Sequence, residues 1–303
     1  MNLHRIEAFL AVAQGGSITR AATQLDVAQS VVSRHVAALE ADLGIRLFER
    51  TGRGVAMTEA AQLLAPRLRA ALADMQRAAA EAAELGGQPG GLVRMGLVPA
   101  AAQPLVGLLH QRLAQRHPRI RLQFVDGFSH ALDERLASGD LDLAVINRFG
   151  RLDPKGEERL CVVDSLLVGP PGALAPDAPA LPFKRLAGVP LVLASRPNGL
   201  RTALDEVCRR VGVQLQVAVE ADSMLTMKGL VMHGGLYSVL PYQLVHEELA
   251  AGRLSAAGIV RPTVPRVLTL VLSHRQAGSA AVRAVAQAVR EIVRDALVKT
   301  VWR

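Results

Sequence analysis

The chain reads SITRAATQLDVAQSVVSRHVAALEADL from Ser17 to Leu43, and this stretch decides the fold of the N-terminal part. It begins with serine, a residue type that caps helix N-termini, and apolar residues at helical spacing follow as far as Leu25. After a short turn at Asp26-Val27-Ala28, a second apolar stripe contains Val32, Val36, Leu39 and Leu43. The stretch therefore predicts two helices joined by a tight turn.

The flanking residues complete a small domain. Upstream, the apolar stripe of a further helix ends at Gly15-Gly16; it consists of Leu3, Ile6, Phe9, Leu10 and Ala13. Downstream, Leu47–Arg50 and Gly54–Thr58 surround a turn rich in glycine, which predicts a β-hairpin. Three helices followed by a hairpin make a winged helix-turn-helix.

A long helix is predicted next, from a cap at Thr58 to about Leu85. Its apolar residues follow a heptad-like seam: Leu64, Leu68, Leu72, Met75, Ala79 and Ala82. Such a stripe needs a partner, and a second copy of the chain is the simplest one. Pro66 is expected to kink the helix near its start. The run Gly86–Gly91 then reads as a linker.

Beyond the linker, predicted strands alternate with predicted helices. The strands are Leu92–Val98, Ile120–Val125, Leu141–Ile146, Pro190–Ala194, Leu215–Val219, Tyr237–Leu240 and Val267–Leu272. The helices are Gln103–Arg116, Ser129–Ala137, Asn198–Val211, Ser223–Met232 and Ala280–Val298. This alternation predicts an α/β domain of parallel sheets with helices on both faces, and its length predicts two lobes.

We therefore expect three parts. Residues 1–58 form the winged helix-turn-helix, and 59–89 form the linker helix and hinge. Residues 90–303 form the larger domain, with lobe I at about 90–161 and 267–303 and lobe II at about 162–266. The late strand is expected to return to the first lobe.

Composition excludes several classes of protein. The chain of 303 residues is 50% hydrophobic, which argues against disorder. Its longest uncharged stretches fall short of the ~18 residues of a membrane span, and charged residues near the N-terminus argue against export, so we expect a cytoplasmic location. The net charge of +8 lies wholly after residue 89, because the first 89 residues contain nine arginines, no lysines and nine acidic residues. Nucleic-acid binding would therefore depend on where individual arginines lie.

The second helix of the turn motif has the features of a recognition helix. Opposite its buried stripe it presents Ser30, Ser33 and Arg34, and Gln29 lies at its N-terminal tip. Glutamine and arginine can make bidentate contacts with adenine and guanine respectively. The hairpin adds two arginines suited to phosphate or minor-groove contact. The full set of candidate DNA-contacting residues is Thr19, Arg20, Gln29, Ser30, Ser33, Arg34, His35, Arg50 and Arg53. The competing interpretation is an ordinary helical bundle with solvated arginines.

The run from Phe9 to Thr58 resembles the LysR-type transcriptional regulators. The resemblance is carried by Ser17–Ala22, by Gln29–Leu39 and by Gly44–Arg50, and the order of parts agrees over essentially the whole chain. It implies a linker helix that makes dimers, a two-lobed effector domain like periplasmic binding proteins, and DNA-bound tetramers. Where the family usually has Ser-Gln-Pro or Ser-Gln-Ser, this chain has Ala28-Gln29-Ser30, so the recognition helix lacks a serine cap.

Ligands of open sheets collect beyond the carboxyl ends of parallel strands. Free N–H groups with Ser195, Asn198 and Arg201 would suit a carboxylate, and residues 195–201 resemble a subgroup related to nitrogen-assimilation regulators. Alanines at 100–102 replace the hydroxyl residues of many relatives. The candidate effector-binding residues are Ala100, Ala101, Gln103, Phe128, Asn147, Ser195, Asn198, Arg201 and Ser223. Several of these could instead be plain helix caps, and Arg201 could pair with Asp205.

We thus expect a regulator that binds an imperfect dyad in double-stranded DNA and responds to a small, anionic effector, with RNA polymerase as a further partner if it activates. No catalytic residue, metal site or cofactor motif is recognised. Cys161 and Cys208 leave a redox switch open. Two further classes stay open as well: a small-molecule binding protein whose helical head only oligomerises, and an α/β enzyme.

Overall fold

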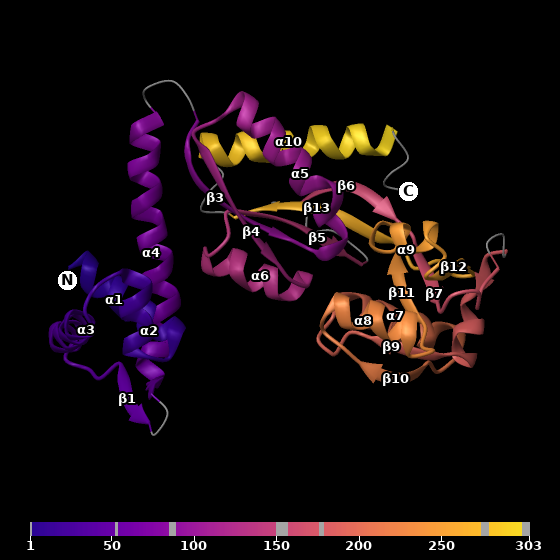
Figure 1. Ribbon diagram of the computed structural model, residues 1–303, viewed down its shortest axis with the longest axis horizontal. Coiled ribbons are helices and arrows are strands. Elements are labelled where there is room, and N and C mark those ends of the chain that lie inside the picture. The colour runs from indigo at the N-terminus through magenta and orange to yellow at the C-terminus, as the bar shows by residue number, and fades with distance from the viewer. Residues whose placement is uncertain are drawn as a thin grey trace. The chain divides into compact units, whose positions relative to one another are not determined.

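A computed structural model describes residues 2–51, 54–84, 89–149, 157–175, 179–273 and 279–298. The chain divides into two compact units, one of residues 1–79 with 138–140 and one of the remaining residues. The first unit contains α1 (Leu3–Gly15), α2 (Ile18–Leu25), α3 (Gln29–Leu43), β1 (Phe48–Thr51), β2 (Gly54–Met57) and most of α4 (Glu59–Glu84), as Figure 1 shows.

The predicted helix-turn-helix and wing are confirmed. Gly16 ends α1 in the left-handed conformation, and Ser17 caps α2 by accepting a hydrogen bond from the Arg20 N–H. The strands β1 and β2 pair antiparallel. Gly54 has a φ of 141°, and a Cβ there would lie 2.7 Å from the carbonyl oxygen of Gly16. Only glycine therefore lets the wing approach the turn between α1 and α2.

The core of this unit comes from the apolar stripes that the sequence shows. Phe9, Leu39 and Leu47 are fully buried, and the rings of Phe9 and Phe48 lie 5.5 Å apart. These contacts bind α1 and α3 to the base of the wing. They hold the opposite side of α3 toward solvent.

The recognition helix α3 begins without a side-chain cap, as predicted. Ala28 occupies the cap position with extended backbone, and no side chain within the described part of the chain caps the first turn of α3. We expect Ala28→Ser to stabilise this unit by about 0.5–2 kcal/mol, because the hydroxyl would satisfy one of those donors. Thermal unfolding of the full chain measures the change, and Ala28→Val, which lacks an acceptor, is the control. Equal melting temperatures for the two variants would contradict the capping argument.

Part of the apolar seam of the linker helix α4 packs within its own unit. Thr58 caps it by accepting from the Ala61 N–H at 3.2 Å, and the helix continues through Pro66 as one element. Leu68 is buried and Leu64 and Leu72 are partly buried against the core of the helix-turn-helix. Leu63 and Met75, in contrast, are 63% and 60% exposed. The side chains of Ala79 and Ala82 lie outside the described residues.

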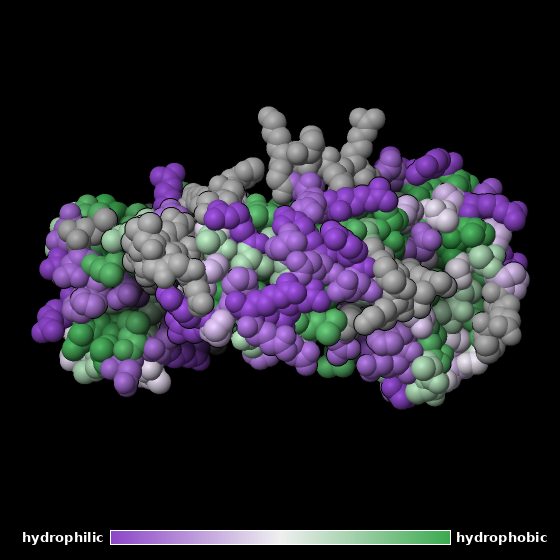
Figure 2. Space-filling view, turned by 90° about the horizontal axis from the view of Figure 1, so that it is seen from above, coloured by the Kyte–Doolittle hydropathy of each residue, from purple (hydrophilic) through white to green (hydrophobic). Residues whose placement is uncertain are grey.

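The second unit contains two lobes, which we define by their sheets. Lobe I is a five-stranded sheet of order β4-β3-β5-β13-β6. Its elements are β3 (Gly91–Leu97), α5 (Pro99–Arg116), β4 (Ile120–Asp126), α6 (Ser129–Ser138), β5 (Leu143–Arg148), β6 (Glu157–Val163), β13 (Arg266–Leu272) and α10 (Ala280–Val298). Helices α5 and α10 cover one face of the sheet and α6 the other (Figure 1). The view onto α5 and α10 is predominantly hydrophilic (Figure 2), and there Arg112 and Arg116 donate to Glu291 at 3.0 and 2.9 Å.

Lobe II has a four-stranded sheet of order β11-β7-β12-β8 and a parallel pair β9-β10. A bridge between Leu191 and Tyr237 links the two sets. The elements are β7 (Ser165–Gly169), β8 (Leu181–Pro182), η1 (Phe183–Gly188), β9 (Pro190–Leu193), α7 (Gly199–Val211), β10 (Gln216–Glu220), α8 (Met224–His233), β11 (Ser238–Pro241), η2 (Tyr242–Leu244), α9 (His246–Ala250) and β12 (Ser255–Val260).

The prediction of parallel sheets is wrong for part of each lobe. β13 runs antiparallel to β5 and β6, and β7 runs antiparallel to β11 and β12. Parallel neighbours need a crossover within one sheet, whereas β13 is reached from lobe II. The late strand does return to the first sheet, as predicted. The helix predicted to begin at Gln103 begins at Pro99, and Gln103 forms a non-helical kink inside it (φ −104°, ψ 134°).

Candidate functional site

The outer side of α3 is open to solvent. Val32, Val36 and Leu39 are buried as predicted, while the side that faces away from them is exposed. The exposed candidates on this side and at its end are Gln29, Ser30, Ser33 and Arg34. Arg34 makes no hydrogen bond or ion pair with any residue that the structure describes. Its guanidinium is therefore available to a ligand.

The other candidate DNA-contacting residues differ in how exposed their side chains are. Thr19 and Arg20 are exposed in the first turn of α2. His35 is only partly exposed, and its ring stacks on that of His4 with 6.4 Å between centroids, so it faces α1. The Arg50 side chain and all of Arg53 lie outside the described residues.

A cavity of about 60 Å³ lies between the two lobes. It is several times larger than one water molecule needs, and much smaller than the ~300–1,000 Å³ of drug-sized ligand sites. Four predicted residues line it: Ala100, Phe128, Asn147 and Asn198. They come from the starts of α5, α6 and α7 and from the end of β5, which is where ligands of open sheets collect.

Five predicted residues are not among those lining this cavity. Ala101 is fully buried in the core of lobe I, and Gln103 is exposed at the kink of α5. The Ser195 N–H donates to Asp222 Oδ1 at 2.8 Å, while Ser223 caps α8. Arg201 is held in an ion-pair network.

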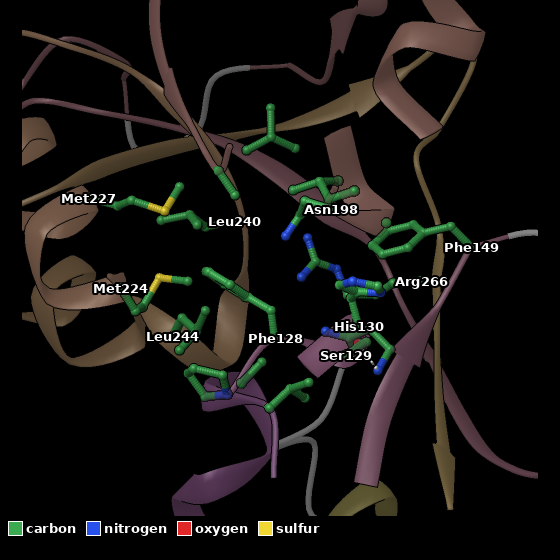
Figure 3. Close-up of a pocket in the computed structure, with 18 residues that line it drawn as sticks. Phe128, Ser129, His130, Phe149, Asn198, Met224, Met227, Leu240, Leu244 and Arg266 are labelled. Carbon is green, nitrogen blue, oxygen red and sulfur yellow. Dashed lines mark hydrogen bonds between the residues drawn. The ribbon is translucent and has the colours of Figure 1, made fainter. Parts of the chain in front are cut away.

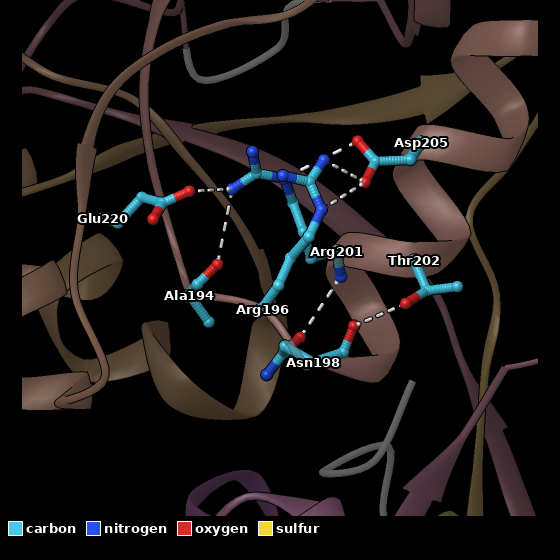
Figure 4. A network of polar contacts seen from close by, with 7 residues as sticks. All are labelled: Ala194, Arg196, Asn198, Arg201, Thr202, Asp205 and Glu220. Atoms are coloured by element: carbon cyan, nitrogen blue, oxygen red, sulfur yellow. Dashed lines mark hydrogen bonds and ion pairs between the residues drawn. The ribbon is translucent and has the colours of Figure 1, made fainter.

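The Arg201 network shapes the loop before α7 (Figure 4). Arg201 is 7% exposed, and its Nη1 donates to Glu220 Oε1 at 2.9 Å. Its Nε lies 3.6 Å from Asp205, which also accepts a hydrogen bond from Arg196. The simpler prediction of an Arg201–Asp205 pair is therefore confirmed. The same helix start is capped by Asn198, whose Oδ1 accepts from the Arg201 N–H, so its amide NH2 group remains as a donor.

Sequence reasoning missed the most unusual residue of the cavity. Arg266 is 5% exposed, and its Nε and Nη2 donate to the Ser165 hydroxyl at 3.3 and 2.9 Å. Its guanidinium lies 5.7 Å from the centre of the Phe149 ring. Burial lowers the pKa of Arg266 to about 10, so it is still charged at neutral pH. No acidic residue is among the described residues that line the cavity.

The remaining lining residues that were missed are Ser129, His130, Phe149, Met224, Met227, Leu240 and Leu244, with six more apolar or glycine positions. Figure 3 shows Met224, Met227, Leu240 and Leu244 on one side of the cavity and Arg266, Asn198 and Phe149 on the other. Arg266 was hard to recognise as a cavity residue from the sequence, because it is a single arginine at the start of an apolar strand. The apolar residues read as ordinary core.

The surroundings of the two cysteines raise the pKa of both thiols. Burial raises the pKa of Cys161 to about 11, and burial together with Asp205 raises the pKa of Cys208. Neither residue lines the cavity. The described residues contain no group of three or more side chains that could hold a metal ion. Within the same residues, no helix is both long and apolar enough to cross a membrane.

A winged helix-turn-helix joined through a long helix to a two-lobed ligand-binding unit defines a class of ligand-responsive transcription regulators. Two family models match the chain: "Bacterial regulatory helix-turn-helix protein, lysR family" over residues 3–62 and "LysR substrate binding domain" over 86–294. The chain belongs to the LysR family of transcriptional regulators, as the resemblance implied. It is therefore a regulator and not an enzyme.

Two relatives agree with this assignment, and a solved structure shares the fold. The chain is 31% identical over 289 residues to a probable hydrogen peroxide-inducible genes activator of Mycobacterium leprae, covering 95% of this chain and 93% of the relative. It is 28% identical over 296 residues to the nitrogen assimilation regulatory protein nac of Escherichia coli, covering 97% and 94%. The crystal structure of CbnR, a LysR family transcriptional regulator, has a TM-score of 0.70 at 20% identity and covers 96% of this chain and 99% of its own.

Proposed function

We propose that this LysR-type regulator binds an imperfect dyad upstream of the genes it controls and that a small anionic effector, of the carboxylate class, changes this binding. The observation that carries the effector is the cavity itself, which contains a buried cation and no acidic residue among its described lining. Buried charges in proteins are normally paired, so an anionic ligand suits this cavity. The net charge of +8, which lies entirely after residue 89, also favours an anion.

The DNA contacts that we propose are those of α3, with Gln29, Ser33 and Arg34 reading base edges. Two copies of α3 must reach successive major grooves, which requires a dimer. The exposed Leu63 and Met75 of α4 support a dimer through this helix, and a tetramer of two such dimers would span a longer site. RNA polymerase is a further partner if the regulator activates transcription.

A footprint of the purified chain on the DNA upstream of its own gene tests the proposal. We expect the protein to protect two half-sites of an interrupted dyad. The length of the protected region should change when a carboxylic acid binds. Complete absence of protection on that DNA, at low salt and with intact protein, would contradict DNA binding. The small-molecule binding protein with an oligomerising head would then be the better interpretation.

A peroxide response is the second candidate, because several relatives are called hydrogen peroxide-inducible genes activators. A peroxide-sensing cysteine reacts as its thiolate, and the raised pKa values of Cys161 and Cys208 keep both thiols protonated at neutral pH. We therefore expect hydrogen peroxide to leave the footprint of the wild type unchanged. Cys161→Ala and Cys208→Ala variants should behave identically. A peroxide-dependent footprint that either variant abolishes would overturn this preference.

A further inference from the structure

Arg266 lies at the hinge between the lobes. The chain passes from lobe I to lobe II through Asp164, between β6 and β7, and returns through residues 261–265, between β12 and β13. Ser165 is the first residue of β7 and Arg266 the first residue of β13. The hydrogen bonds from Arg266 to the Ser165 hydroxyl therefore join the two strands that cross between lobes.

The guanidinium of Arg266 is incompletely satisfied. Nε and Nη2 donate to one neutral hydroxyl, and Nη1 makes no hydrogen bond within the part of the chain that the structure describes. Arg148, by contrast, is paired with both Asp133 and Glu157. Arginine presents a planar set of donors that matches a carboxylate in a bidentate pair. Asn198 faces the same cavity, and its amide NH2 group donates to none of the described residues (Figure 3).

The other side of the cavity is apolar. Met224, Met227, Leu240 and Leu244 face Arg266 across it, so a ligand that pairs with Arg266 would place its other end against thioethers and aliphatic carbons (Figure 3). His130, the other basic residue of the described lining, is half exposed and lies 3.3 Å from Glu134. One buried cation opposite an apolar wall in a cavity of about 60 Å³ suits one carboxylate on a short chain.

We propose that Arg266 is the effector-binding residue that selects the anion, and that the effector is a short aliphatic monocarboxylate. This inference rests on the proposed function, since it names the ligand of the same cavity. The carboxylate pairs with Arg266 and accepts from the Asn198 amide, and the hydrocarbon chain lies against Met224 and Met227. Because a bound carboxylate competes for the donors that now hold Ser165, binding is coupled to the hinge that joins the lobes.

Isothermal titration calorimetry on the full chain tests the ligand class with propanoate, butanoate, pentanoate, octanoate and succinate, and with butanamide as the uncharged match of butanoate. We expect the wild type to prefer butanoate over butanamide by roughly tenfold or more, as for loss of a charged hydrogen-bonded pair. Octanoate should bind more weakly because it exceeds the cavity, and succinate because its second carboxylate would meet the apolar wall. In Arg266→Met the preference for the acid should disappear.

Matched variants keep the test independent of folding. Arg209→Met removes the same charge from an exposed position of α7 and should leave the acid preference unchanged. Arg266→Lys keeps the charge without the planar donors and should bind butanoate with intermediate affinity. A cooperative thermal unfolding transition, followed by circular dichroism, shows that each variant is folded. Equal binding of acid and amide by the wild type, or a retained preference in Arg266→Met, would overturn the proposal.

The two proposals can fail separately. If the acids bind but never alter the footprint, Arg266 is still the anion site and the regulatory proposal fails. If operator DNA is protected and none of these acids binds, DNA recognition stands and the monocarboxylate inference is overturned.

Discussion

Arg34→Ala is expected to weaken binding to the operator by roughly 10- to 100-fold, while binding to scrambled DNA falls only a few-fold. Arg34 is exposed on α3 and has no partner among the described residues, so its removal costs the fold little. A bidentate pair with guanine is specific for that base, whereas a phosphate contact strengthens binding to every sequence equally. Titrations of both DNAs at several salt concentrations measure the difference.

Arg34→Lys is the matched control for charge. Lysine retains the attraction to phosphate but lacks the planar pair of donors, so it should restore non-specific binding and not operator binding. If Arg34→Ala weakened binding to both DNAs equally, and reduced the slope of log affinity against log salt concentration by about one, Arg34 would be a phosphate contact instead. The base-reading role would then pass to Gln29 and Ser33.

The DNA-binding unit could be predicted closely because its signals are local. Serine and glycine at the helix ends fix the turns, and the apolar stripes have the period of a helix. The structure places Ser17, Gly16 and Leu39 in the roles that the sequence indicates. The linker helix was less predictable, because Leu64, Leu68 and Leu72 satisfy the heptad pattern and yet pack on their own unit. A heptad period does not show whether the apolar stripe packs on its own unit or on a second copy of the chain.

The effector cavity was harder to predict because it forms between segments distant in sequence. The rule for sheet edges found Ala100, Asn147 and Asn198, which follow or precede their strands and helices directly. It also chose Arg201, whose partner Glu220 lies on the neighbouring strand β10 and withdraws it from the ligand. Arg266 follows no recognisable junction, because β13 enters lobe I from the other lobe. No carboxylate among the described residues lines the cavity beside Arg266, and this depends on how distant segments pack, which the sequence does not reveal.

Arg266→Met is expected to make the ligand-free protein more stable by about 2 kcal/mol. Burial lowers the pKa of Arg266 to about 10, well below its ordinary value, which corresponds to a folding cost on the order of 3 kcal/mol for the charged form. This cost is constant at neutral pH, and it falls only as the pH rises above the folded-state pKa. Methionine has a similar length and suits the apolar wall, while the lost hydrogen bonds to Ser165 offset about 0.5–1.5 kcal/mol of the gain.

Arg201→Met is the control because it removes another buried arginine of the same unit. Arg201 is 7% exposed and Arg266 5%, but Arg201 has Glu220 and Asp205 beside it. Its replacement should destabilise the protein by about 1–3 kcal/mol, a value reduced because both carboxylates are partly exposed. Thermal unfolding in buffer free of carboxylates should therefore shift the two melting temperatures in opposite directions, by about 2–4 °C for each kcal/mol.

Ligand binding should reverse the order of stability between the wild type and Arg266→Met. Butanoate in excess adds stability only to a protein that binds it, so the wild-type melting temperature rises with its concentration while that of Arg266→Met stays constant. If Arg266→Met melted below the wild type without ligand, by as much as Arg201→Met does, Arg266 would be a satisfied structural residue. A buried cation that costs stability without ligand and returns it when an anion binds is the behaviour expected of a ligand-binding residue.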